Sequence, residues 1–186
     1  EGGIRNYRSL VSNTDVPFIS ECAIMGPSSK ETLAKIFPED KLWPMNELWD
    51  DRLMENPYGI VPLTFAQRQM KYAEDTYGKV KNLEDFTAKA MQVHAEAMRV
   101  EAEFARSNEG ITAGFMNWMY SDIWPCGTWS AVDYFTEPKQ VYYQMKKCCG
   151  VCTKPTRPSD RRNFCAGWRN WQGSAGSRNR STCALS

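Results

Sequence analysis

Hydrophobic residues recur at helical spacing in two long stretches of the chain. From Phe65 to Tyr77, and again from Leu83 to Arg106, apolar side chains lie three or four positions apart, with few residues that break helices. The pattern predicts two helices, the second of them long. One face of the second helix is expected to carry Phe86, Ala90, Val93, Ala97, Val100 and Phe104.

Two shorter apolar segments have the length of strands. Phe18 and Ile19 follow Pro17, and proline is best tolerated at the first residue of a strand. Residues 111–120, ITAGFMNWMY, form a mostly apolar run, which is typical of a strand buried on both faces of a parallel sheet. We therefore predict one strand that ends at Glu21 and a second within residues 111–120.

Two further helices are indicated by their first residues. Ser28 and Glu31 have capping-box spacing, so a short helix is expected over residues 28–37, with Pro38 as its stop. Pro138 is expected in the first turn of a final helix. The inward side chains of that final helix are expected to be Val141, Tyr142 and Met145.

An aromatic-rich segment separates the first short helix from the two long ones. Between Pro38 and Pro62, prolines and the Asn-Pro and Tyr-Gly steps predict a long structured loop without regular elements. The order is then strand, helix, loop, two helices, strand and helix, so the fold class is α/β. Two strands alone neither close a barrel nor bury their own faces.

Composition is that of an ordinary soluble globular domain. The 186 residues are 42% hydrophobic and 24% charged. No apolar run approaches the roughly 20 residues of a membrane span, and no amino-terminal stretch has the order of a signal peptide. We therefore expect no membrane span, and the cellular location and oligomeric state stay open.

Charge and cysteine content change near residue 148. Residues 1–148 carry a net charge of −5 and residues 149–186 carry +6. The second segment shows neither helical nor strand periodicity, so we expect a domain over residues 1–148, followed by a basic, cysteine-containing tail that is disordered or foreign to the fold. Zinc binding and nucleic-acid binding by this tail are weaker alternatives, because its later cysteines, Cys165 and Cys183, lack the compact spacing of a zinc knuckle. We expect neither a metal nor a nucleic-acid partner.

Glu21 stands where the first predicted strand ends, and this position has two interpretations. It is either the first solvated residue after a strand or a carboxylate at the carboxyl end of a barrel strand, where (β/α) enzymes collect their catalytic groups. Spacing alone favours the first interpretation.

The segments FISE-(x)4-GPS and MNWMYSDIWPCGTWSAVDYFTEPKQVYYQMKK together resemble the carboxyl-terminal part of glycoside hydrolase family 2 catalytic barrels, particularly the β-mannosidase-like and exo-β-glucosaminidase-like members. The resemblance covers roughly residues 4–148 and implies strands seven and eight of a (β/α)8 TIM barrel with their helices. Ser121 departs from it, since the family usually has asparagine there. The matching residues of the second segment are Trp118, Asp122, Trp124, Pro125, Trp129, Ser130, Asp133, Tyr134, Pro138, Lys139, Tyr142 and Tyr143.

The resemblance implies that Glu21 is the catalytic nucleophile of a retaining exo-β-glycosidase that needs no cofactor and acts on terminal β-linked sugars. Such an enzyme also needs a carboxyl group as acid and then base, held about 5–5.5 Å from the nucleophile. In the family this group lies on strand four, before the nucleophile. Asn46-Glu47 follows Glu21 and is rejected for that role. We therefore expect a fragment that is inactive alone, of a parent that hydrolyses β-mannosides, β-glucosaminides or β-galactosides.

Tryptophans supply the apolar surface of a sugar site. Trp118, at the end of the last strand, is expected to form the floor of the subsite for the cleaved sugar. For Trp43, Trp49, Trp124 and Trp129, walls of that subsite and plain loop packing are equally open. Asp122 either binds a sugar hydroxyl or holds its loop. Asp133 is expected to hold the loop.

Other reactive side chains suggest no competing chemistry. His94 is the only histidine and lies within the long predicted helix, so we expect a surface or packed residue there and no catalytic triad. Cys22 adjoins Glu21 without a histidine nearby to activate it, and is expected to be a small buried residue. The main alternative to an enzyme is a carbohydrate-binding or interaction module without hydrolytic activity.

Overall fold

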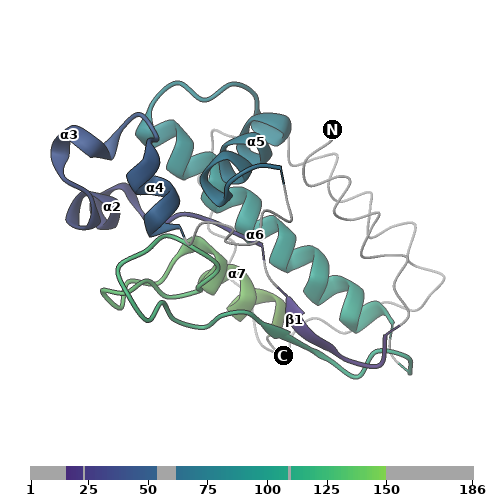
Figure 1. Ribbon diagram of the computed structural model, residues 1–186. Coiled ribbons are helices and arrows are strands. Elements are labelled where there is room, and N and C mark those ends of the chain that lie inside the picture. Colours follow the sequence, from purple (N-terminus) through teal and green to yellow (C-terminus); the bar gives the residue numbers. More distant parts are fainter. Residues whose placement is uncertain (1–15, 23, 54–61, 109, 150–186) are drawn as a thin grey trace, which may run out of the picture. The chain divides into compact units, whose positions relative to one another are not determined.

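The computed structural model describes residues 16–22, 24–53, 62–108 and 110–149 (Figure 1). All of them belong to the first of two compact units, Glu1–Thr153. The second unit, Lys154–Ser186, lies outside the described residues, as do the predictions made for the tail beyond Cys149. Within the described ranges, no helix is both long and apolar enough to cross a membrane.

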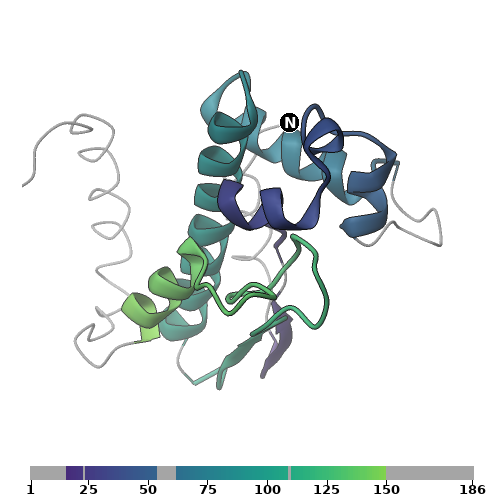
Figure 2. The same ribbon diagram turned by 90° about the vertical axis from the view of Figure 1, so that its left-hand side faces the viewer.

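Helices and strands follow one another in the order predicted for an α/β fold, except that two short helices lie where a loop was predicted. Among the described residues, two strands are separated by five helices, and a sixth helix follows. Figures 1 and 2 show how these elements are arranged. The described residues therefore have an α/β fold, while the (β/α)8 barrel stays a prediction. The elements are β1 (Ile19–Cys22), α2 (Lys30–Ile36), α3 (Glu39–Leu42), α4 (Glu47–Arg52), α5 (Phe65–Tyr77), α6 (Leu83–Ser107), β2 (Phe115–Asn117) and α7 (Gln140–Cys149).

The two strands form a parallel pair in which Ile19 lies opposite Phe115 and Cys22 lies opposite Asn117, with an irregularity in register between them. Burial on both faces, predicted for residues 111–120, is wrong. The strand is shorter than that run, and its middle residue, Met116, is 55% exposed. The reason is that only one face of the described pair is covered, by a cluster that includes Cys22, Met98 and Val141 from β1, α6 and α7.

Both long helices have the bounds that the periodicity predicts, within one residue at the end of α6. Thr64 and Gln67 form a capping box at the start of α5, and the Asn82 side chain accepts a hydrogen bond from the backbone N–H of Asp85 at the start of α6. The predicted face of α6 is buried from Phe86 to Val100, and its last member, Phe104, is half-buried.

Three local predictions are wrong. Pro138 lies before α7, which begins at Gln140, and not in its first turn. The capping residue of α2 is Ser29, which accepts from the backbone N–H of Thr32, and not Ser28, whose hydroxyl donates to the carbonyl of Cys126. The long loop after Pro38 contains α3 and α4. Asn46 caps α4 by accepting from the backbone N–H of Leu48, a local signal hidden among prolines and aromatic residues.

Aromatic residues of the segment that contains α3 and α4 pack into the main hydrophobic core. Trp49 is fully buried, stacks on Phe37 with ring centroids 4.7 Å apart, and meets the edge of Phe86 at 5.9 Å. Its indole N–H donates to the Leu42 carbonyl at 3.1 Å. In the smaller core beneath the strands, Val141 is buried and two partly buried residues of α7 pack beside it, as predicted: Tyr142 and Met145.

Candidate functional site

Glu21 and Trp118 lie at neighbouring strand ends. Glu21 is an exposed residue of β1, and Trp118, which is 48% exposed, directly follows β2. The backbone N–H of Trp118 donates to the carbonyl of Cys22 at 3.0 Å, so the parallel pairing continues to this point. A carboxylate and an indole ring are therefore presented from adjacent strands.

Glu21 also borders a hollow of about 280 Å³ beside the carboxyl-terminal half of α6. Phe18 and Ile19 of the β1 segment line it together with Glu101 and Phe104 of α6, whereas Trp118 is not among its lining residues. Glu21 thus borders this hollow, while Trp118 lies outside its lining.

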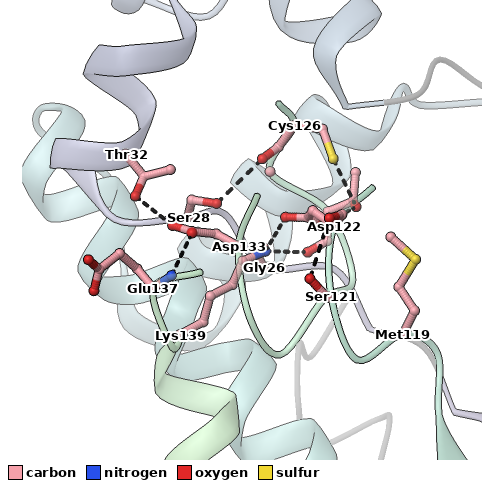
Figure 3. Close-up of polar contacts among 12 residues, drawn as sticks. Gly26, Ser28, Thr32, Met119, Ser121, Asp122, Cys126, Asp133, Glu137 and Lys139 are labelled. Carbon is pink, nitrogen blue, oxygen red and sulfur yellow. Dashed lines mark hydrogen bonds and ion pairs between the residues drawn. The ribbon is translucent and has the colours of Figure 1, made fainter. Parts of the chain in front are cut away.

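The loop that follows Trp118 is organised around a buried ion pair (Figure 3). The ammonium of Lys139 lies 3.5 Å from one carboxylate oxygen of Asp122, and these side chains are 3% and 0% exposed. The hydroxyl of Thr128 donates to the other Asp122 oxygen at 3.2 Å. Burial lowers the pKa of Lys139, while the charge of Asp122 opposes that shift. Of the two roles left open for Asp122, the structure favours holding the loop.

Asp133 holds its loop as expected. One carboxylate oxygen accepts from the backbone N–H groups of Phe135 and Glu137, both at 2.9 Å, and the other accepts from the Thr32 hydroxyl at 2.6 Å. Asp133 therefore shapes the turn that precedes α7 and ties it to α2.

The remaining tryptophans divide between core and loop. Trp43 is half-buried against Trp49 and Phe86, which favours a packing role for Trp43. Trp49 is fully buried, so its ring does not form part of an open wall of a sugar subsite. Trp124 and Trp129 are each half-buried. Their neighbours are Arg52 over the Trp124 ring and Phe65 against the edge of Trp129. Sugar contact by Trp124 or Trp129 stays a prediction.

Asn46 and Glu47, the pair rejected as acid/base, begin α4. The Asn46 side chain caps the helix, and Glu47 lies in its first turn. A carboxylate there stabilises the amino-terminal end of a helix, which accounts for the pair without catalysis.

His94 is buried, so of the two positions left open for it, surface or packed, the structure shows the packed one. A Cβ built on Gly26 would lie 2.5 Å from both Cβ and Nδ1 of His94, so the loop after β1 requires glycine to pass over the imidazole. Neither ring nitrogen has a hydrogen-bond partner among the described residues. Burial, with a smaller contribution from the charge of Lys139, lowers the pKa of His94 to about 3.

This burial makes the stability of the chain depend on pH. Because the folded pKa of about 3 lies below the unfolded value of about 6.5, the unfolded state binds the extra proton. The stabilisation is complete above pH 6.5 and is lost as pH falls toward 3. We expect the free energy of unfolding in urea to fall by about 2 kcal/mol from pH 7 to pH 5.

The control for this prediction is His94→Leu, which removes the only imidazole in the chain. Its free energy of unfolding should change much less over the same interval. An equal decrease in the variant and in the unchanged chain would contradict the assignment to His94.

The described residues contain no group of three or more histidine, cysteine, aspartate or glutamate side chains that is arranged to hold a metal ion. Cys22 is buried, as expected. Burial, together with the nearby charge of Asp122, raises the pKa of Cys126 to about 12, so Cys126 is a neutral thiol at ordinary pH.

No family model matches the chain. Over 73 residues, 38% of its length, the chain is 36% identical to an exo-β-D-glucosaminidase of Arthroderma benhamiae, of which the match covers 8%. The crystal structure of a β-D-mannosidase from Dictyoglomus thermophilum is similar over 76% of the chain and 17% of the mannosidase, with a TM-score of 0.66 and 22% identity. The chain therefore spans only a small part of the length of either protein.

These matches agree with the motifs quoted from the sequence. One is a similarity in sequence and the other a similarity in fold, and both proteins are glycosidases by name. The resemblance to glycoside hydrolases of family 2 of the β-mannosidase-like or exo-β-glucosaminidase-like kind is thus confirmed for part of their length.

Proposed function

We propose that this chain is part of a retaining exo-β-glycosidase in which Glu21 is the nucleophile and Trp118 is the floor of the subsite for the cleaved sugar. A β-mannoside is the leading substrate, and a β-glucosaminide is the alternative. The observation that carries the proposal is the placement of Glu21 and Trp118, both exposed, at the ends of two paired parallel strands.

The arrangement suits a covalent mechanism. The Glu21 carboxylate attacks the anomeric carbon and forms a glycosyl ester as the bond to the leaving oxygen breaks, and that oxygen takes a proton from a second carboxyl group. Water, deprotonated by the same group, then attacks the anomeric carbon and releases the sugar and the Glu21 carboxylate. The exposed Trp118 ring offers an apolar face on which a pyranose can pack.

The second carboxyl group is proposed to come from a longer polypeptide that includes this segment. The matched regions make up 8% and 17% of the two similar proteins, which supports a larger parent. Further strands of that parent would also pair with the outer edges of β1 and β2. The 186-residue chain alone is proposed to be inactive.

A mechanism-based label tests the nucleophile directly. The longer gene product is incubated with a 2-deoxy-2-fluoro-β-mannosyl fluoride and, separately, with the corresponding glucosyl reagent, and is then digested for mass spectrometry. We expect one fluorosugar per chain on the peptide that contains Glu21, with parallel loss of aryl glycoside hydrolysis. Labelling elsewhere, or hydrolysis that survives full labelling, would refute the assignment. Binding of mannose without any hydrolysis would favour a carbohydrate-binding module.

A further inference from the structure

The two strand ends are followed by loops that are tied together by hydrogen bonds. The backbone N–H of Gly26, in the loop after β1, donates to the carbonyl of Thr128 at 3.3 Å. The Ser28 hydroxyl donates to the carbonyl of Cys126 at 3.4 Å. These contacts link the loop that leaves Glu21 to the loop that leaves Trp118.

Lys139 lies at the centre of this junction (Figure 3). Its ammonium donates to the carbonyl of Gly26 at 3.4 Å and to the carbonyl of Thr128 at 3.3 Å, and it pairs with Asp122 at 3.5 Å. One side chain therefore contacts the loop that leaves Glu21 and, at two points, the loop that leaves Trp118.

The contacts of Lys139 hold its ammonium in one place, unlike the charge of a mobile surface lysine. The Lys139 side chain is 3% exposed, and a buried ammonium is tolerated only where acceptors surround it. It donates hydrogen bonds to two backbone carbonyls and forms an ion pair with one carboxylate, so both its donors and its charge are partly compensated. The Asp122 carboxylate is restrained in turn by the Thr128 hydroxyl.

We propose that Lys139 is a positioning residue for the glycosidase reaction: it fixes the loop after Glu21 against the loop after Trp118 and so sets the nucleophile relative to the bound sugar. This inference rests on the proposed function. Lys139 is buried and acts through these two loops, without touching the substrate.

The test compares variants of the longer gene product after titration of their active sites with the fluorosugar label. Lys139→Met removes the ammonium at similar volume. Lys139→Met combined with Asp122→Asn removes both charges, and so avoids leaving Asp122 buried and unpaired. In both variants we expect kcat per labelled site on an aryl glycoside to fall on the order of tenfold, with a much smaller change in KM, because misplacement penalises the reacting geometry more than binding.

Thr32→Val is the matched control. It removes the buried hydrogen bond from Thr32 to Asp133 in the same loop cluster, a bond in which neither Gly26 nor Lys139 takes part. We expect a lower midpoint of thermal unfolding in this variant and an unchanged kcat per labelled site.

Each outcome distinguishes this inference from the proposed function. If the unaltered enzyme is active and labelled on Glu21, but both Lys139 variants keep its kcat per site, Lys139 has only a structural role and the inference is wrong. If the Lys139 variants lose no more kcat per site than Thr32→Val does, the same conclusion follows. If the unaltered enzyme cleaves no aryl glycoside, or is labelled elsewhere, the proposed function fails and the inference fails with it.

Discussion

Replacement of Glu21 by alanine in the longer gene product is expected to lower kcat for aryl β-mannoside hydrolysis on the order of 10⁴-fold or more, the scale of loss when an enzyme loses its nucleophile. Glu21 is exposed on β1, so the change should not lower folding stability appreciably. Steady-state kinetics and a thermal unfolding curve of the same preparation would measure both effects.

Adding azide to the Glu21→Ala variant tests the nucleophile assignment further. A small anion can enter the space left by the carboxylate and attack the anomeric carbon directly, so part of the rate should return. The product should then be an α-glycosyl azide, with configuration inverted once instead of retained.

Glu47→Ala is the matched control, because Glu47 is a glutamate of α4 that completes the Asn-Glu dipeptide. It should keep kcat within about twofold, since surface changes away from a site have small effects. Full activity of Glu21→Ala, or a β-glycosyl azide as its product, would show that another residue is the nucleophile.

The sequence predicted the helices best where local signals agree with tertiary packing. In α5 and α6, periodicity and the capping residues Thr64 and Asn82 all indicate the same bounds. Burial of the second strand on both faces was predicted wrongly because an apolar run is equally consistent with a strand covered on both faces and with one that has an open face. Only the packing distinguishes these two cases.

The site was predictable only in part. The family motif around Glu21 and Trp118 predicted their roles, which stay predictions, and the structure places both residues at the ends of paired strands. The junction of Lys139 with Gly26, and the packing of Gly26 on His94, join residues far apart in sequence, so no local pattern reports them. Lys139 and His94 are both buried, although their side chains are polar.

The tryptophans show why composition alone could not separate core from site. Trp49 and Trp118 both lie in segments rich in aromatic residues, but one is fully buried and the other is 48% exposed. In the 186-residue chain, Trp49→Ala is expected to lower the free energy of unfolding by about 3–5 kcal/mol, as for other buried aromatic residues replaced by alanine. It removes the stacking on Phe37 and the hydrogen bond to Leu42.

Trp118→Ala is the matched comparison, and we expect it to affect catalysis more than folding stability. Because half of its ring is already in water, we expect a loss of about 1 kcal/mol or less in urea unfolding. In the longer gene product the same change should lower kcat/KM on the order of tenfold through the lost packing of the sugar ring. Equal stability losses in the two variants would contradict the burial that separates them, and an unchanged kcat/KM in Trp118→Ala would remove Trp118 from the sugar subsite while leaving the role of Glu21 to be judged by its own variant.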